Sequence, residues 1–151
     1  MPRQKVTPFL WYDNNAEEAA RFYVSLFKNS RINRVVPGPT GTAMLVEFTL
    51  DGTEYLAMNG GPHNKLTEAI SLSVDCADQA EVDDLWEKLS EGGSKIQCGW
   101  LKDKFGLSWQ IIPSILPKLM ADPQRCGAVM QALVQMTKLD IEKLQAAYDG
   151  R

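Results

Sequence analysis

The side chains best suited to chemistry are few in this chain. His63 is the single histidine, and the three cysteines, Cys76, Cys98 and Cys126, form no Cys-x-x-Cys pair. A zinc site of several histidines is therefore excluded, and any Ser-His-Asp or Cys-His triad would have to use His63. The sequence also contains no Gly-x-x-x-x-Gly-Lys-Ser/Thr phosphate loop and no Gly-x-Gly-x-x-Gly turn after a strand.

His63 and Glu54 are the candidates for carrying a proton. His63 lies in the polar stretch Gly60–Asn64, and an imidazole is the commonest acid or base near neutral pH. Glu54 and Tyr55 follow the turn signal Asp51-Gly52. The alternatives are a solvated loop histidine and solvated or helix-facing side chains at 54 and 55.

Composition limits the class of protein. The chain has 151 residues, of which 44% are hydrophobic, enough to bury a core of its own. Its 16 Lys and Arg against 19 Asp and Glu give a net charge of −3, which argues against nucleic acid as a partner. Charges and prolines interrupt every long apolar run, so we expect no membrane span and no secretory signal. The scattered cysteines predict free thiols in a reducing cytoplasm.

Hydrophobic periodicity predicts the same order of elements in both halves of the chain: a strand, a helix and then further strands. Asn15 and Glu18 resemble a capping box for the first helix, and Asp78 with Glu81 begins the second. The predicted strands cover residues 5–12, 31–37, 43–50, 53–58, 69–74, one or two within 95–102, and 107–112.

The last part of the chain changes character. Pro113, Pro117 and Pro123 interrupt it, and residues 124–138 then have helical composition with a wide apolar face. Asp140 is placed to cap a final short helix. The wide face either covers the core of its own domain or packs against a second subunit.

Several segments together carry a family resemblance. They are TPFLWYD at 7–13 followed by NAEEA at 15–19, EAISLSV at 68–74, CGWLKDKFGLSWQ at 98–110, and VMQAL with MTKLDI within 129–141. With the repeated element order, they resemble the vicinal oxygen chelate superfamily, which includes glyoxalase I and bleomycin-resistance proteins. The closest likeness is to its PhnB-like branch, often labelled demethylubiquinone methyltransferase-like.

The resemblance implies an α+β fold in which paired βαβββ modules curl their sheets around one cleft. The modules would occupy residues 5–60 and 67–113 of a single domain, 1–151, with a helical extension over 114–151. It also implies a homodimer and, in many members, four ligands for a divalent metal on the first and last strands of each module.

The implied metal positions are poor in donors here. They fall near Pro8, Leu56, Ala69 and Gln110, and hard cations prefer carboxylates, while zinc prefers His, Cys or carboxylate. A register slip of one residue would turn Glu68 inward. Glu68 and Gln110 are therefore the remaining metal candidates, and we expect a weak or lost site, although a divalent metal stays possible.

Strand alternation predicts which side chains line the cleft in the second module. Ile70, Leu72 and Val74 should face the helix, which leaves Ser71 and Ser73 on the other side. The predicted ligand contacts are Ser71, Ser73, Ser108, Gln110, Tyr55 and Trp100. The alternative is that these residues only fill a packed barrel floor.

Three functions follow from these observations, and the sequence leaves open whether the chain is catalytic. The first is binding of a small organic molecule without need of a cofactor. The second is a metal-dependent enzyme of the glyoxalase or dioxygenase kind, with a metal that orients vicinal oxygens. The third, methyl transfer to a quinone, ranks last because no motif for S-adenosylmethionine is present.

Overall fold

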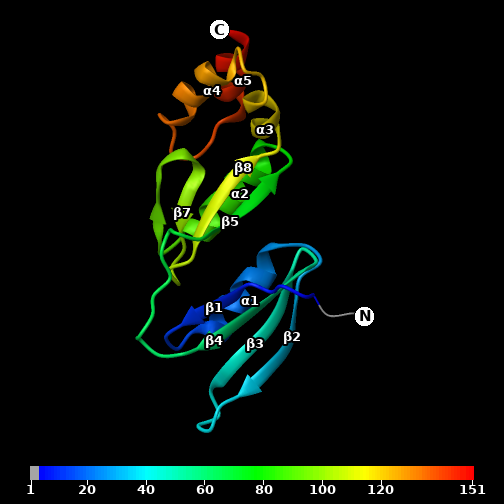
Figure 1. The fold of residues 1–151 in the computed structure, drawn as a ribbon, viewed down its shortest axis with the longest axis vertical. Helices are drawn as coiled ribbons and strands as arrows, with labels where there is room; N and C mark the ends of the chain where they lie inside the picture. The colour runs from blue at the N-terminus through cyan, green and yellow to red at the C-terminus, as the bar shows by residue number, and fades with distance from the viewer. Residues whose placement is uncertain (1–3) are drawn as a thin grey trace. The chain divides into compact units, whose positions relative to one another are not determined.

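The computed structural model describes residues 4–151, so the first three residues of the predicted domain lie outside it. The chain divides between Leu66 and Thr67 into two compact units (Figure 1). None of the helices in the described part has the length and apolar character needed to cross a bilayer.

The first unit is a four-stranded mixed sheet with one helix on one face (Figure 1). Its strand order is β1-β4-β3-β2, in which β1 and β4 are parallel and the other pairs are antiparallel. The elements are β1 (Phe9–Tyr12), α1 (Ala16–Leu26), β2 (Arg31–Pro37), β3 (Ala43–Leu50) and β4 (Thr53–Asn59).

Helix α1 buries a stripe of small and aromatic side chains against this sheet. Ala16, Ala19, Ala20 and Tyr23 are buried, and the Tyr23 ring lies 6.4 Å from that of Phe48 on β3. The predicted capping role of Asn15 is wrong, because its side chain makes no cap hydrogen bond. The backbone N–H of Ala16 instead donates to Oδ1 of Asn59, at 2.8 Å. The end of β4 thus caps the helix.

The second unit repeats the order of elements. Its sheet has the order β5-β8-β7-β6, with β5 and β8 parallel, and α2 packs on one face (Figure 1). The elements are β5 (Ser71–Cys76), α2 (Gln79–Ser90), β6 (Ser94–Lys95), a short 3-10 turn (Gln97–Gly99), β7 (Trp100–Lys102) and β8 (Ser108–Pro113). The predicted α+β fold is confirmed.

The predicted cap of α2 is also confirmed. The Asp78 side chain accepts from the N–H of Glu81 at 2.9 Å, and Glu81 in turn accepts from the N–H of Ala77. The helix buries Val82, Leu85, Trp86 and Leu89. Strands β7 and β8 supply the buried side chains Leu101, Trp109 and Ile111 to the core of this unit.

Two strands begin later than predicted. The first starts at Phe9 rather than at residue 5, and β5 starts at Ser71 rather than at Ala69. Ile70 was expected to face the helix, but it lies before the strand with 56% of its surface exposed. Val6, Ala69 and Ile70 extended the apolar pattern in the sequence, but the strand pairing begins only at Phe9 and Ser71.

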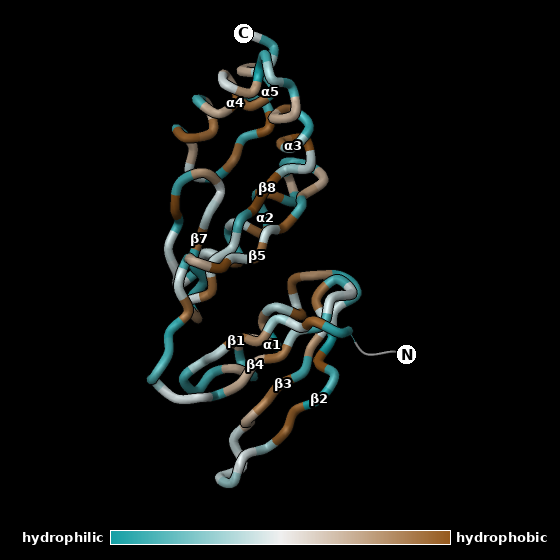
Figure 2. The backbone as a smooth tube through the Cα atoms, in the orientation of Figure 1, coloured by the Kyte–Doolittle hydropathy of each residue, from teal (hydrophilic) through white to brown (hydrophobic). Residues whose placement is uncertain are grey.

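Three helices complete the second unit, and their segment alternates hydrophobic and hydrophilic stretches (Figure 2). Helix α3 lies in the segment 114–151 that was predicted to be helical, although Pro117 falls within it; proline is tolerated in a first turn, where no intrahelical N–H bond is required. The helices are α3 (Ile115–Met120), α4 (Cys126–Leu133) and α5 (Ile141–Asp149). Their core contains Leu116, Leu119, Val129, Leu139 and Leu144.

The backbone at Cys98 and Gly99 fastens these helices to the sheet. The two N–H groups donate to the carbonyls of Met136 and Thr137, both at 2.8 Å. Gly99 has φ +83°, and a Cβ there would lie 3.0 Å from Leu139. A glycine is needed for this close approach.

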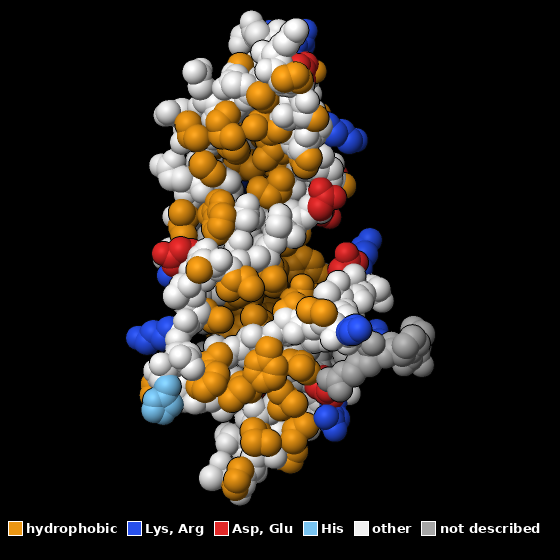
Figure 3. Space-filling view, in the orientation of Figure 1, with side chains coloured by type: hydrophobic (Ala, Val, Ile, Leu, Met, Phe, Trp, Pro, Cys, Tyr) orange, Lys and Arg blue, Asp and Glu red, His pale blue; other side chains and the backbone are white. Residues whose placement is uncertain are grey.

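Part of the outer surface of this unit is apolar. Hydrophobic groups gather over the helices in Figure 3, and Met130 and Val134 are among the exposed ones.

Candidate functional site

Five of the predicted ligand contacts share one face of the second sheet, which we call the open face. Ser71 and Ser73 pair in register with Ser108 and Gln110 of β8, and Trp100 of β7 pairs with Gln110. Paired residues point to the same side of a sheet, and residues two apart along a strand do so as well. Since the intervening Trp109 and Leu101 are buried, the five side chains lie on the side opposite α2.

The polar groups of the open face are only partly satisfied. Nε2 of Gln110 donates to Oγ of Ser71 at 3.0 Å, which leaves the Ser71 proton and Oε1 of Gln110 free among the described residues. Ser108 is fully buried, and its Oγ has no hydrogen-bond partner within residues 4–151. A buried hydroxyl without a partner costs about 1–3 kcal/mol. Such a group is therefore a marker for a missing ligand or water.

A buried carboxylate holds Ser108 in place, a feature that the sequence analysis missed. Asp103 is 2% exposed, although a charged residue between two lysines in a turn is ordinarily solvated. Its Oδ1 accepts from the N–H groups of Phe105 and Leu107 at 2.8 and 3.0 Å, and its Oδ2 accepts from Nε1 of Trp109 at 2.9 Å. Both neighbours of Ser108 are thus fixed. The signal was present: an aspartate opening a tight turn that closes on Gly106 typically binds its own backbone.

The ionic groups next to the open face form a pair of their own. Lys102 pairs in register with Ser108, and its Nζ lies 3.7 Å from Oε2 of Glu68. The Glu68 side chain is 70% exposed and precedes β5. It therefore pairs with an ammonium group near the surface instead of pointing inward from the strand.

Tyr55 and Glu54 lie on opposite sides of the first sheet. The Tyr55 ring stacks on Phe48 with centroids 5.4 Å apart, and Phe48 faces α1, so Tyr55 is on the helix side. Burial raises the pKa of its phenol. Glu54 borders a cavity of about 240 Å³ that Asn33 and Glu47 also line; its Oε2 accepts from the N–H of Gln4, at 3.2 Å.

His63 lies in an exposed turn after β4. Nearby, Nε1 of Trp11 donates to the carbonyl of Gly61 at 2.9 Å, and a Cβ on Gly60 would lie 2.4 Å from the Trp11 ring. The loop is therefore packed on Trp11. Among the described residues, no carboxylate or hydroxyl hydrogen bond to His63 supports a role in proton transfer.

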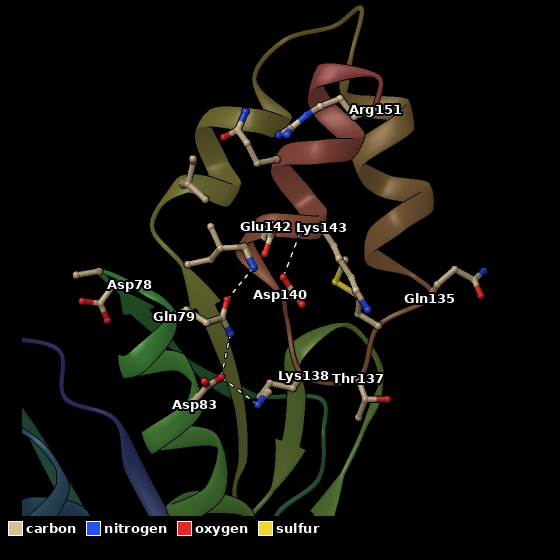
Figure 4. Close-up of a pocket in the computed structure, with 15 residues that line it drawn as sticks. Asp78, Gln79, Asp83, Gln135, Thr137, Lys138, Asp140, Glu142, Lys143 and Arg151 are labelled. Carbon is tan, nitrogen blue, oxygen red and sulfur yellow. Dashed lines mark hydrogen bonds and ion pairs between the residues drawn. The ribbon is translucent and has the colours of Figure 1, made fainter.

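A larger cavity, about 960 Å³, opens where the C-terminal segment meets α2 (Figure 4). Gln79 bridges its walls: Oε1 accepts from the N–H of Ile141 at 2.8 Å, and Nε2 donates to the carbonyl of Leu139 and to Asp83. Nζ of Lys138 lies 3.0 Å from Oδ1 of Asp83. These bonds lower the pKa of the Asp83 carboxyl, the Gln79 bond most. The polar groups here join helices to one another.

The metal that related folds carry does not fit the donors of this chain. Leu56 offers no ligand atom, Ala69 lies outside the strand, and Gln110 offers a neutral amide oxygen in place of the carboxylate that hard cations prefer. Glu68 is engaged by Lys102. Across residues 4–151, no three His, Cys, Asp or Glu side chains gather at a place that could hold a metal ion.

Two βαβββ units with this strand order define a protein of the vicinal oxygen chelate superfamily. The sequence model of 3-demethylubiquinone-9 3-methyltransferase matches residues 4–112, and the chain belongs to that family. The matched part ends before the C-terminal helices, so their predicted likeness to the family stays a prediction. No curated protein matches the sequence.

Solved structures agree with this assignment. The PhnB protein of Bacillus cereus is 34% identical, with a TM-score of 0.69 over 73% of this chain and 99% of its own. Protein PA1353 of Pseudomonas aeruginosa has a TM-score of 0.60 at 20% identity, over 74% and 98% of the two chains. The fosfomycin resistance protein FosX of Listeria monocytogenes, solved with Mn(II) and sulfate, reaches 0.50 at 16% identity, over 72% and 90%. The last two show the fold alone.

The turns after the first strand of each described unit do not have the sequence expected for the methyl donor that the family name implies. Phosphate- and nucleoside-binding loops place a glycine-rich turn directly after a strand. Here β1 is followed by Asp13-Asn14-Asn15, and β5 is followed by Ala77-Asp78. These loops do not fit S-adenosylmethionine.

Proposed function

We propose that this protein binds a small organic molecule on the open face of the second sheet, by direct hydrogen bonds and without a divalent metal. The buried Ser108 hydroxyl is the observation that carries the proposal. It stands beside the Ser71–Gln110 hydrogen bond, at a place that Asp103 fixes through both neighbours of Ser108.

The chemistry of the donor set favours binding over metal-dependent catalysis. Ser71, Ser108 and Gln110 are neutral and would meet a ligand with hydroxyl and amide groups. The indole of Trp100, half-buried on the same face, offers a planar surface for stacking. A chelate enzyme would need carboxylate or imidazole ligands, and the open face presents none at its centre. Homodimerisation and a cytoplasmic location stay predictions.

Saturation-transfer NMR tests the proposal with four planar probes: benzamide, catechol, benzoate and benzylammonium. In protein treated with EDTA, we expect saturation transfer to at least one probe, and a weaker signal in Ser108→Ala. Ser94→Ala is the matched control, because Ser94 is an exposed serine on β6 of the same sheet and is not among the predicted ligand contacts, and it should leave the signal unchanged. No transfer to any probe, or transfer that both variants retain, would reject the open face as a binding site.

A further inference from the structure

We infer that the ligand presents an uncharged planar group of the amide kind, with a carbonyl next to an N–H or O–H, to Ser108, Ser71 and Gln110. This inference rests on the proposed function and names the class of ligand. It follows from the hydrogen-bonding capacity left over at the site and from the placement of the nearest charges.

Among the described residues, the hydrogen-bonding groups at the site that have no partner are hydroxyl donors and one strong acceptor. Ser71 uses an oxygen lone pair to accept from Gln110, so its proton is available to a ligand. Ser108 offers both a proton and lone pairs, and Oε1 of Gln110 is an acceptor. Ser71 and Ser108 are paired across neighbouring strands, about 4.8 Å apart. Because Ser108 is fully buried in the ligand-free protein, the side chains that cover it would have to move aside on binding; a single carbonyl oxygen between the two serines would then accept from both hydroxyls, while an adjacent N–H donates to Gln110.

The charges around the site argue against an ionic ligand group. A carboxylate or phosphate needs a free cation, but Lys102 is already paired with Glu68. An ammonium group needs a free anion. Asp75 on the same face lies four residues beyond Ser71 along β5, about 13 Å away, and Asp103 already accepts three hydrogen bonds. An ion brought to the buried Ser108 would lose its hydration without a counter-charge.

The flat surface comes from Trp100. Its strand position is directly opposite Gln110, and its indole nitrogen has no hydrogen-bond partner among residues 4–151. Offset stacking on an indole is favourable for any planar π-system, and it leaves the ligand edge free for hydrogen bonds. A planar amide or lactam satisfies both demands, with its ring on Trp100 and its polar edge at Ser108.

Three probes with the same ring and different charge test the inference: benzamide, benzoate and benzylammonium. Each is titrated into ¹⁵N-labelled protein while the Trp100 indole N–H resonance, assigned with Trp100→Phe, is followed. Benzamide should shift this resonance saturably, with a Kd on the order of 1 mM for so small a ligand. Ser108→Ala should weaken binding about tenfold, the effect of one hydrogen bond, and Ser94→Ala, at an exposed serine of β6, should not.

The outcomes separate this inference from the proposed function. Tighter binding of benzoate or benzylammonium than of benzamide, sensitive to Ser108→Ala, would overturn the neutral-ligand inference and leave the open face as the binding site. No saturable shift from any of the three probes would overturn both. A benzamide shift that Ser108→Ala leaves unchanged would contradict the assigned role of Ser108.

Discussion

Replacement of Ser108 by alanine is expected to stabilise the ligand-free protein. The Ser108 hydroxyl is fully buried and has no partner in the described chain, so its removal ends a desolvation cost of about 1–3 kcal/mol. The void left by one oxygen atom, on the order of 15 Å³, reduces this gain in stability by about 0.4 kcal/mol. The lower strand propensity of alanine reduces it by a few tenths of a kcal/mol more. The net gain is about 1 kcal/mol, or about 2–4 °C in Tm.

Urea unfolding of the wild type, Ser108→Ala and Ser73→Ala measures this gain. The exposed Ser73 serves as the control and should stay within about 0.5 kcal/mol of the wild type. A loss of 1 kcal/mol or more in Ser108→Ala would refute the reasoning, since it would mean that the hydroxyl already has a good partner. The predicted pattern is unusual: one substitution makes the protein more stable and makes it bind less well.

Three further predictions concern the groups around this site. Asp103→Asn should lower stability by about 2–3 kcal/mol, because either orientation of the amide turns its NH₂ toward a backbone or Trp109 donor; urea unfolding checks this, and the exposed Asp75→Asn should change little. Burial, together with the nearby Glu81 carboxylate, raises the pKa of the Cys76 thiol to about 12, so Ellman's reagent should titrate two thiols in the native protein and the third only after denaturation. Prompt reaction of all three thiols would contradict that expectation. The pKa of Asp83 is lowered in the folded state. Its carboxylate therefore contributes fully to the free energy of unfolding above the ordinary value of 3.8, and this contribution is lost as the pH falls below that value. Stability of the wild type should therefore fall more between pH 6 and pH 3 than that of Asp83→Asn, and equal losses would exclude the Asp83 contribution.

The order of elements was predictable because periodicity and turn chemistry agree locally. The strands at 31–37 and 43–50 were predicted with their observed bounds, since the Asp51-Gly52 turn and alternating side chains define them. Asp78 and Asp140 cap their helices as expected. Strand alternation also placed Ser71 and Ser73 opposite the helix without any knowledge of the partner strands.

What the sequence could not show depends on tertiary contacts. The Asn15 side chain makes no cap hydrogen bond to α1, and the first N–H group of the helix is instead bonded by Asn59, 44 positions further along the chain. Asp103 is a charged residue in a turn, and its burial depends on the Trp109 indole and two backbone N–H groups that donate to it. Whether the Ser108 hydroxyl has a hydrogen-bond partner depends on which groups lie next to it in the folded chain. No periodicity argument distinguishes a satisfied serine from an unsatisfied one.

The most direct test of metal-free recognition is the benzamide titration, followed at the Trp100 indole resonance, before and after dialysis against EDTA. The account predicts the same saturable shift and the same Kd in both samples, with tenfold weaker binding in Ser108→Ala. A shift that disappears with EDTA and returns on addition of Mn²⁺ or Zn²⁺ would contradict it, because the open face would then hold its ligand through a metal.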